Sequence, residues 1–234
     1  MKILGLAKTS TVDYPGKLVS TIFLGGCNFD CEYCHNRALI KPEASATSIS
    51  EEELLAFLQS RKSIIEGLCI TGGEATIWGE KLINLVRKIK IELGKNFLIK
   101  LDTNGSNPKF LKSYAKEFDY IAMDFKTIDY KKHLNFSDEI IKESLDILKT
   151  SKVPYEIRIT MYPPYINQSD FEAMAKVLKG INKVILQKYK PVELGSQKTY
   201  SILVLEEFKE ILIKTKINDN KNILNWTTAS EINN

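Results

Sequence analysis

The sequence has few cysteines and histidines, and it lacks long apolar runs. Four cysteines and two histidines occur in 234 residues. No stretch approaches the roughly 20 apolar residues of a membrane-spanning helix, and the N-terminus lacks the charged and then apolar pattern of a signal peptide. Four cysteines are too few for a disulfide framework in a chain of this size. We therefore expect a cytoplasmic protein with no membrane partner.

The chain also lacks a strong excess of either charge. Its 33 Lys and Arg residues nearly balance 29 Asp and Glu residues, and the net charge at pH 7 is +4. The basic residues are scattered among acidic ones, so the pattern does not indicate nucleic acid as a partner. A mildly basic surface would suit an acidic protein partner.

Three of the four cysteines lie close together. The segment GGCNFDCEYCHN (25–36) contains Cys27, Cys31 and Cys34, with three residues in the first gap and two in the second. In a reducing compartment, such a group indicates metal binding rather than a disulfide. Two alternatives follow, zinc and an iron–sulfur cluster.

Zinc would need a fourth ligand, because structural zinc sites are closed by four ligands that usually come in pairs. His35 directly follows Cys34, and adjacent residues rarely both reach one tetrahedral ion. Cys69 lies within a predicted strand, where a free cysteine usually acts as a small buried apolar residue. A [4Fe–4S] cluster normally takes four thiolates. Three cysteines would leave one iron open, which is typical of a catalytic metal site.

Short β-rich segments alternate with longer segments of helical periodicity. At roughly thirty residues per unit, this alternation predicts βα units with parallel strands. Ser50 and Glu53 have capping-box spacing, and Asn107 with Pro108 predicts another helix start. The expected strands cover 19–25, 67–71, 97–102, 119–125, 154–162 and 182–187. The expected helices cover 50–61, 80–93, 107–118, 137–149, 169–179 and 203–214.

Polar and glycine-rich motifs follow these predicted strands. The cysteine segment follows the first strand, GGE (72–74) the second and DTNG (102–105) the third; Asp124 and Lys126 close the fourth. Arg158 lies within the fifth. Enzyme sites of α/β barrels lie at the carboxyl ends of the strands. The fold class that we expect is α/β, a partial (β/α)6 TIM-like barrel with outer helices and an open lateral side.

The cysteine spacing, with Tyr33 before the last cysteine, resembles the signature of the radical S-adenosylmethionine superfamily. Four segments, 12–36, 70–78, 100–108 and 122–126, further resemble glycyl-radical-enzyme activating proteins. They are most similar to activating proteins of anaerobic ribonucleoside-triphosphate reductase. The resemblance runs from about Gly5 to about Lys190. It implies a single domain over 1–234, with a core of about 16–190 and a C-terminal helical extension over 191–234.

The resemblance implies that the three cysteines hold one [4Fe–4S] cluster, whose open iron is chelated by S-adenosylmethionine. Reductive cleavage then gives methionine and a 5′-deoxyadenosyl radical. Glu74 is expected to accept a hydrogen bond from the methionine amino group; Ala75 follows it where the family generally has proline. The expected cofactor-binding residues are Tyr33, His35, Gly72, Gly73, Glu74, Asp102, Thr103, Asn104, Asp124, Lys126, Arg158 and Leu186.

The same resemblance assigns roles at the radical end of the site. Asp124 and Lys126 are expected to flank the path to a substrate glycine, as the catalytic residues. Asp102, Thr103 and Asp124 resemble a site for a monovalent cation. The last expected strand should bring Leu186 and Gln187 near the adenine, and Tyr189 stands where some relatives have a histidine.

The expected partner is a glycyl radical enzyme, in the first place anaerobic ribonucleoside-triphosphate reductase. No second set of cysteines is available for an auxiliary cluster, so flavodoxin or ferredoxin should donate the electron. Pyruvate formate-lyase or another glycyl radical enzyme is an alternative partner. A small-molecule enzyme of the deazaguanine-synthesis type and a zinc-stabilised interaction module without catalysis are the alternative functions.

Overall fold

The computed structural model describes residues 1–189. Seven strands form one sheet whose spatial order is the order of the chain. Strands β2 to β7 pair in parallel, and β1 pairs antiparallel with β2. The strands are β1 (Ile3–Ser10), β2 (Val19–Leu24), β3 (Gly67–Gly72), β4 (Leu98–Thr103), β5 (Tyr120–Asp124), β6 (Tyr155–Met161) and β7 (Val184–Lys188). The predicted helix 203–214 and extension 191–234 lie outside the described residues.

The six strands expected from the sequence are confirmed, to within one or two residues at their ends. The sequence did not predict β1. The sheet therefore includes residues that precede residue 16, the expected start of the core. Its segment ILGLAKTS has no regular alternation of apolar and polar residues. Its pairing with β2 is also interrupted by register shifts after Ile3 and Ala7. These irregularities explain why the pattern was not recognised.

Five helices, α2, α3, α4, α6 and α7, lie at predicted positions, whereas the sequence did not predict the short helices α1 and α5. Ser50 Oγ accepts from the Glu53 amide at 3.1 Å, and the Glu53 carboxylate accepts from the Ser50 amide at 2.8 Å. Asn107 caps α4, whose last turn tightens into a 3₁₀ helix, so α4 ends before the predicted residue 118. The helices are α1 (Arg37–Ile40), α2 (Glu51–Arg61), α3 (Glu80–Leu93), α4 (Pro108–Tyr114), α5 (Tyr130–Leu134), α6 (Asp138–Lys149) and α7 (Gln168–Val177), with 3₁₀ turns η1 (Ala75–Trp78) and η2 (Ala115–Glu117).

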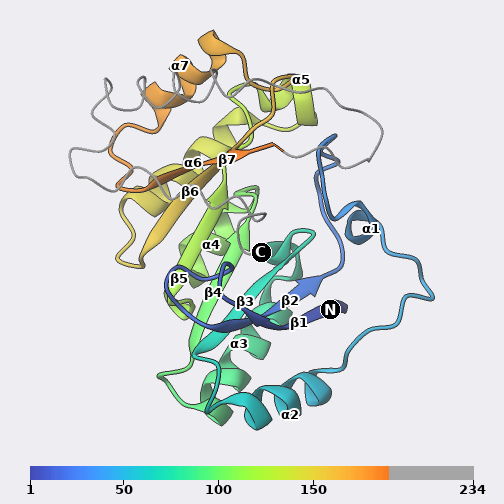
Figure 1. Ribbon diagram of the computed structural model, residues 1–234. Coiled ribbons are helices and arrows are strands. Elements are labelled where there is room, and N and C mark those ends of the chain that lie inside the picture. Colours follow the sequence, from blue (N-terminus) through green and yellow to red (C-terminus); the bar gives the residue numbers. More distant parts are fainter. Residues whose placement is uncertain (190–234) are drawn as a thin grey trace, which may run out of the picture.

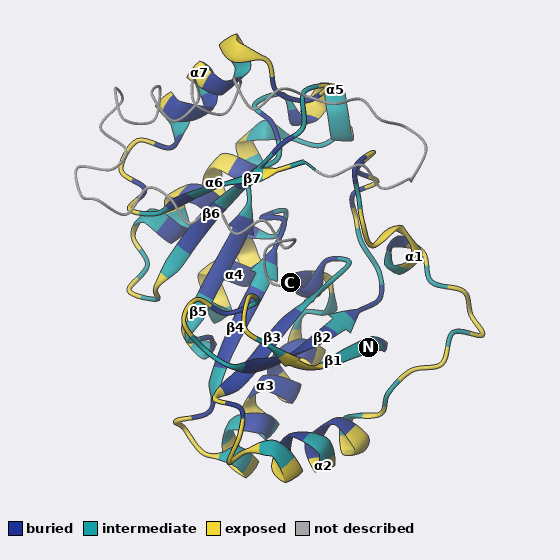
Figure 2. Ribbon diagram, viewed as in Figure 1, coloured by how far each residue is buried: buried dark blue, intermediate teal, exposed yellow. Residues whose placement is uncertain are grey.

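One face of the sheet packs against the helices to form the main core. The strands twist from β1 and β2 in the lower half of Figure 1 to β6 and β7 in its upper half. Figure 2 shows the strands largely buried and the helices with exposed outer faces. Alternate strand residues such as Ile70, Leu101 and Ile157 join helix residues such as Val86 and Leu145 in one apolar cluster. Each such fully buried aliphatic side chain contributes about 1.5–3 kcal/mol.

The opposite face of the sheet carries polar and charged side chains. Because side chains alternate along a strand, the residues beside those of the core face the other way, among them Lys100, Asp102 and Arg158. Within residues 1–189, β1 and β7 form the two edges and do not pair with each other, so the sheet stays open. None of the described helices is both long and apolar enough to cross a membrane.

Candidate active site

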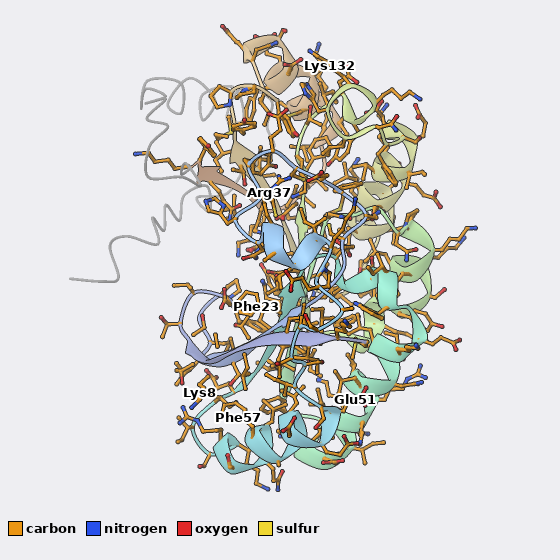
Figure 3. All side chains as sticks on the ribbon, turned by 90° about the vertical axis from the view of Figure 1, so that its right-hand side faces the viewer. Lys8, Phe23, Arg37, Glu51, Phe57 and Lys132 are labelled. Atoms are coloured by element: carbon orange, nitrogen blue, oxygen red, sulfur yellow. The ribbon has the colours of Figure 1, made fainter. Side chains whose placement is uncertain are left out.

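The cysteine loop begins directly after β2, and its start is held by the residues at its far end. The amide of Gly26 donates to the Leu39 carbonyl at 2.7 Å, and the amide of Cys27 donates to the Ile40 carbonyl at 3.1 Å. Leu39 and Ile40 belong to α1, so the loop closes on itself. Figure 3 shows this region, with Arg37 of α1 lying between Phe23 of β2 and Lys132 of α5.

The three cysteines of this loop line one cavity of about 480 Å³, a size in the range of small-molecule sites. The Cys34 amide donates to the Cys31 carbonyl at 3.1 Å, and the Arg37 guanidinium donates to the same carbonyl at 2.9 Å. All three thiols are free of disulfides. Burial raises the pKa of Cys31 to about 11. A bound cation would be needed to hold this thiol as a thiolate.

Residues 1–189 contain no group of three or more His, Cys, Asp or Glu side chains placed to hold one metal ion. Thiolates of a cubane cluster each bind a different iron, so a cluster does not require them to converge on a single point. Cys69 does not line the cavity: it packs with Tyr14 and Val19 in a separate small apolar cluster. Its position therefore gives no fourth ligand beside the other three.

The glycines of GGE allow β3 to end directly against the cysteine loop. Gly73 donates its amide to the Leu24 carbonyl at 2.8 Å, and the Glu74 amide donates to the Gly26 carbonyl at 2.7 Å. A Cβ atom on Gly73 would lie 1.9 Å from the Gly26 carbonyl oxygen. Gly72 has a φ of +131°, which side-chain-bearing residues rarely adopt. A side chain at either position would therefore collide with the backbone of Leu24 or Gly26.

Glu74 is buried, and the described protein groups already hold its carboxylate. Oε1 accepts from the Thr76 amide at 3.0 Å, from the Thr76 hydroxyl at 2.6 Å and from the Thr103 hydroxyl at 2.8 Å. Oε2 accepts from the Asn104 amide at 2.6 Å. Burial raises the pKa of Glu74, while these hydrogen bonds oppose the shift. Glu74 thus joins the end of β3 to the DTNG turn after β4.

The DTNG turn is joined to the cysteine loop by two asparagines. Asn104 Nδ2 donates to Asn28 Oδ1 at 3.0 Å, and Asn28 Nδ2 donates to the Ser106 hydroxyl at 2.8 Å. Asn104 Nδ2 also lies 4.0 Å from Cys27 Sγ. The loops after β2, β3 and β4 are therefore fixed to each other before any ligand binds.

A row of alternating charge crosses the strand ends beside the cavity. We call Lys100, Asp102, Arg158, Asp124 and Lys126 the charge row. Arg158 donates from Nε to Asp124 Oδ1 at 2.8 Å and from Nη1 to Asp102 Oδ2 at 3.2 Å. Lys126 Nζ lies 3.3 Å from Asp124 Oδ2. Burial alone would raise the pKa of Asp124, but Arg158 and Lys126 outweigh it and lower the pKa to about 2.

Tyr33 carries a buried hydroxyl that has no hydrogen-bond partner among residues 1–189. Its ring packs against Tyr162, with centroids 4.9 Å apart, and against Tyr165 at 5.5 Å. Lys126 Nζ lies 5.8 Å from the centroid of the Tyr33 ring. Buried hydroxyls are normally satisfied, so this group in the cavity wall fits a polar ligand. The paired charges of Lys126 and Asp124 suit a ligand that carries both an amino and a carboxylate group.

The structure brings nearly all of the sequence-predicted site residues to this one cavity. Leu186 is the exception: it packs against the apolar core, and its neighbour Gln187 lines the cavity instead. Tyr189 is not among the lining residues either, and its ring lies 4.8 Å from that of Tyr162. The predicted residues that do line it are Cys27, Tyr33, Cys31, Cys34, His35, Gly72, Gly73, Glu74, Asp102, Thr103, Asn104, Asp124, Lys126 and Arg158.

Sequence reasoning missed several residues of the wall. Thr160 could have been found from strand alternation, since it lies two residues after Arg158 on the same strand. Lys188 could not, because it directly follows Gln187 at the end of β7. Thr71 lies near the end of β3 and could also have been predicted from strand alternation. Phe29 and Asn36 lie inside the cysteine loop, where no periodic pattern exists to indicate their direction.

Three comparisons relate this chain to known proteins. A family model of the Radical SAM superfamily matches residues 21–178. A protein of Methanocaldococcus jannaschii, assigned as a glycyl-radical enzyme activating enzyme, is 31% identical over 80% of this chain and 79% of its own length. The 7-carboxy-7-deazaguanine synthase of Thermococcus kodakarensis is 26% identical over 74% and 75%. The pyruvate formate-lyase-activating enzyme of Staphylococcus aureus is 28% identical over 68% of each chain.

Solved structures share the fold. A domain of the pyruvate-formate lyase-activating enzyme of Bacteroides vulgatus superposes with a TM-score of 0.53 and 17% identity, covering 65% of this chain and 96% of that one. Streptococcus suis SuiB bound to S-adenosylmethionine gives a TM-score of 0.60 and 14% identity, covering 83% and 48%. These neighbours agree with the partial barrel expected from the sequence.

Proposed function

Because this chain belongs to the radical SAM superfamily, we propose that its cavity holds a [4Fe–4S] cluster on Cys27, Cys31 and Cys34 together with S-adenosylmethionine. The observation that carries the proposal is that these three thiols line the same cavity as Asp102, Asp124, Lys126 and Arg158 of the charge row. Bound there, cluster and cofactor supply one-electron cleavage that yields methionine and a 5′-deoxyadenosyl radical. The protein binds, orients and shields them.

The charge row would orient the methionine end of the cofactor. Asp102 and Asp124 offer carboxylates to an amino group, while Arg158 and Lys126 offer donors to a carboxylate. The Tyr33 hydroxyl, which no described residue hydrogen-bonds, is available for the nucleoside end. Protein groups donate four hydrogen bonds to Glu74, only one of them to Oε2, and its expected bond to the amino group remains a prediction. Its observed contacts support a positioning role for the DTNG turn.

The proposed substrate is a glycine of a glycyl radical enzyme, from whose Cα one hydrogen atom is transferred to form 5′-deoxyadenosine. The relative of M. jannaschii supports this class of substrate. An open sheet edge, within the described residues, also suits a peptide loop. Anaerobic ribonucleoside-triphosphate reductase is the partner that we propose first, with flavodoxin or ferredoxin as the electron donor in the cytoplasm. Pyruvate formate-lyase is the alternative, supported by the relative of S. aureus.

A small-molecule radical enzyme is the second candidate function. The similarity to a 7-carboxy-7-deazaguanine synthase supports it, since that relative matches nearly as much of the chain. Both functions use the same cluster and the same cofactor. They differ in whether the radical is transferred to a glycine of a protein or to a free heterocycle.

The monovalent cation at Asp102, Thr103 and Asp124 remains a prediction of the family resemblance. Hard cations bind through oxygen donors, and the resemblance supplies three. Both carboxylates, however, already carry ion pairs with side chains of the protein.

Anaerobic reconstitution followed by electron paramagnetic resonance tests the proposed function. We expect about four irons per chain and cleavage of S-adenosylmethionine under reducing conditions. With a peptide carrying the glycine loop of anaerobic ribonucleotide reductase, we expect a glycyl radical signal. A signal with the pyruvate formate-lyase peptide alone would name the other partner. Cleavage without radical on any glycine peptide would favour the small-molecule function.

Cysteine substitutions provide a matched control. Cys31→Ala is expected to abolish cleavage, because it removes one of three cluster ligands. Cys69→Ala removes another buried thiol, which lies outside the cavity, so it should retain the iron and lower stability by about 1 kcal/mol. Retention of cleavage in Cys31→Ala would refute the cluster assignment. Loss of iron in Cys69→Ala would show that the fourth cysteine is a ligand.

A further inference from the structure

Lys100 is a charged residue in the interior of the protein. It lies in the middle of β4 and is 1% exposed. A buried ammonium group is costly unless it is paired and hydrogen-bonded. Its Nζ contacts Asp102 Oδ1, two residues further along the same face of the strand, and lies 3.8 Å from Cys69 Sγ. Burial alone would lower the pKa of Lys100, but Asp102 outweighs it and leaves the pKa above its ordinary value.

Every carboxylate oxygen of the charge row already has a cationic partner. Asp102 Oδ1 contacts Lys100, and Asp102 Oδ2 lies 3.2 Å from Arg158 Nη1. Asp124 Oδ1 lies 2.8 Å from Arg158 Nε, and Asp124 Oδ2 lies 3.3 Å from Lys126 Nζ. Three cationic side chains therefore face two carboxylates. A metal ion would have to share each of these oxygens with a cationic side chain that already neutralises it.

The third oxygen expected for a cation is occupied too. The Thr103 hydroxyl donates to Glu74 Oε1 at 2.8 Å and accepts from the Gly105 amide at 3.1 Å. An alkali ion here could use only the one remaining lone pair of this oxygen. It would also add positive charge beside Arg158 and Lys100, where like charges repel in a poorly solvated site. The residues present do not fit a monovalent cation.

We propose that Lys100 takes the place of a monovalent cation, so that this chain binds S-adenosylmethionine without Na⁺ or K⁺. The inference rests on the cavity being the cofactor site, as in the proposed function, but not on the identity of the protein substrate. Lys100 is a positioning residue: it acts through Asp102, which lines the cavity, while Lys100 itself does not. Arg158, on the other side of Asp102, completes the neutralisation.

A lysine differs from a dissolved ion in one useful respect. Its ammonium is attached to the chain, and its removal from water is a cost of folding rather than of ligand binding. Cofactor affinity then does not depend on the concentration of any ion. An alkali-ion site would instead couple the two, because an ion that contacts both protein and ligand raises affinity in proportion to its occupancy.

The test is calorimetric binding of S-adenosylmethionine to the reconstituted protein at one ionic strength, in tetramethylammonium chloride and in potassium or sodium chloride. The bulky quaternary ion cannot enter an oxygen-lined site. The unmodified chain is expected to bind equally in all three salts, to within about twofold. A tenfold or larger gain, on the order of one ion-pair contact, in potassium or sodium would overturn the proposal.

Substitution of Lys100 reverses the expectation. Lys100→Ala opens a space beside Asp102, so its affinity should fall by about tenfold or more in tetramethylammonium chloride. Potassium, sodium or methylammonium should restore it. Lys90→Ala, which removes the lysine of a partly buried pair with Asp119 elsewhere in the molecule, should bind like the unmodified chain in every salt. Lys100→Ala with unchanged affinity in tetramethylammonium would also overturn the proposal.

Two features keep the result interpretable. Should Lys100→Ala fail to fold, the salt comparison on the unmodified chain still decides, because it needs no variant. Binding is measured without any glycyl protein or radical chemistry, so a failed salt test leaves the proposed function untouched. Failure of the proposed function would appear as an absent cluster or as radical transfer to no glycine.

Discussion

The two faces of the sheet differ although the same strands build them. On β4, Leu101 points into the apolar core and is fully buried, whereas the next residue, Asp102, lines the cavity. The helix-facing side is apolar, and many interchangeable contacts stabilise it. The cavity side holds a few charged groups, each of which depends on a specific partner from another strand. Asp102, for example, pairs with Arg158, which lies 56 residues later in the chain. Stability therefore comes mainly from one face, and ligand chemistry from the other.

The largest expected effect concerns the helix-facing side. Leu101→Ala removes a fully buried side chain from the main cluster and should lower the free energy of unfolding by about 4 kcal/mol. Urea denaturation measures this loss. The affinity for S-adenosylmethionine, measured where the variant remains folded, should not change. A fall in affinity that parallels the fall in stability would mean that the two faces are not separable.

Arg158→Met tests the cavity side with a smaller change in stability. It leaves two largely buried carboxylates side by side without their shared guanidinium, which should cost about 3 kcal/mol. Unlike Leu101→Ala, it should also sharply reduce cofactor affinity. Arg87→Ala breaks an exposed pair with Glu117 and serves as the control, with an expected loss below about 1 kcal/mol. Normal affinity in Arg158→Met would remove the charge row from the cofactor site.

The pH dependence of stability is the smallest expected effect. Asp124 has a pKa of about 2 in the folded protein against an ordinary value of 3.8. Its ion pairs therefore stabilise the protein fully above about pH 4, and this stabilisation is lost as the pH falls through 2. Acid denaturation of the protein without cofactor should show this loss, and Arg158→Met should flatten it. An equally steep acid limb in the variant would place the responsible carboxylates elsewhere.

Much of the fold could be predicted because local rules govern it. The capping box at Ser50 and Glu53 and the Asn107 cap are decided by residues within one turn, and both are confirmed. The six parallel strands follow from their β-branched apolar runs. The strand Ile3–Ser10 escaped because its pairing, broken by register shifts, depends on β2 rather than on its own pattern.

The site was predicted in outline rather than in its contacts. The cysteines, GGE, DTNG and AMDFK motifs identified the wall, since the ends of parallel strands share one edge. The sequence places both Leu186 and Gln187 at the wall, but only Gln187 lines it, because successive residues of a strand face opposite sides. The partners of Lys100 and Glu74 could not be foreseen: alternation shows which face a side chain takes, but not which distant group meets it.

Electron paramagnetic resonance of the reduced, reconstituted protein, recorded before and after S-adenosylmethionine is added, tests the central claim most directly. Three thiolates should hold a cluster with one iron free of protein ligands, so the added cofactor should bind that iron and change the spectrum. A spectrum identical in both samples, or a protein without iron, would contradict the account.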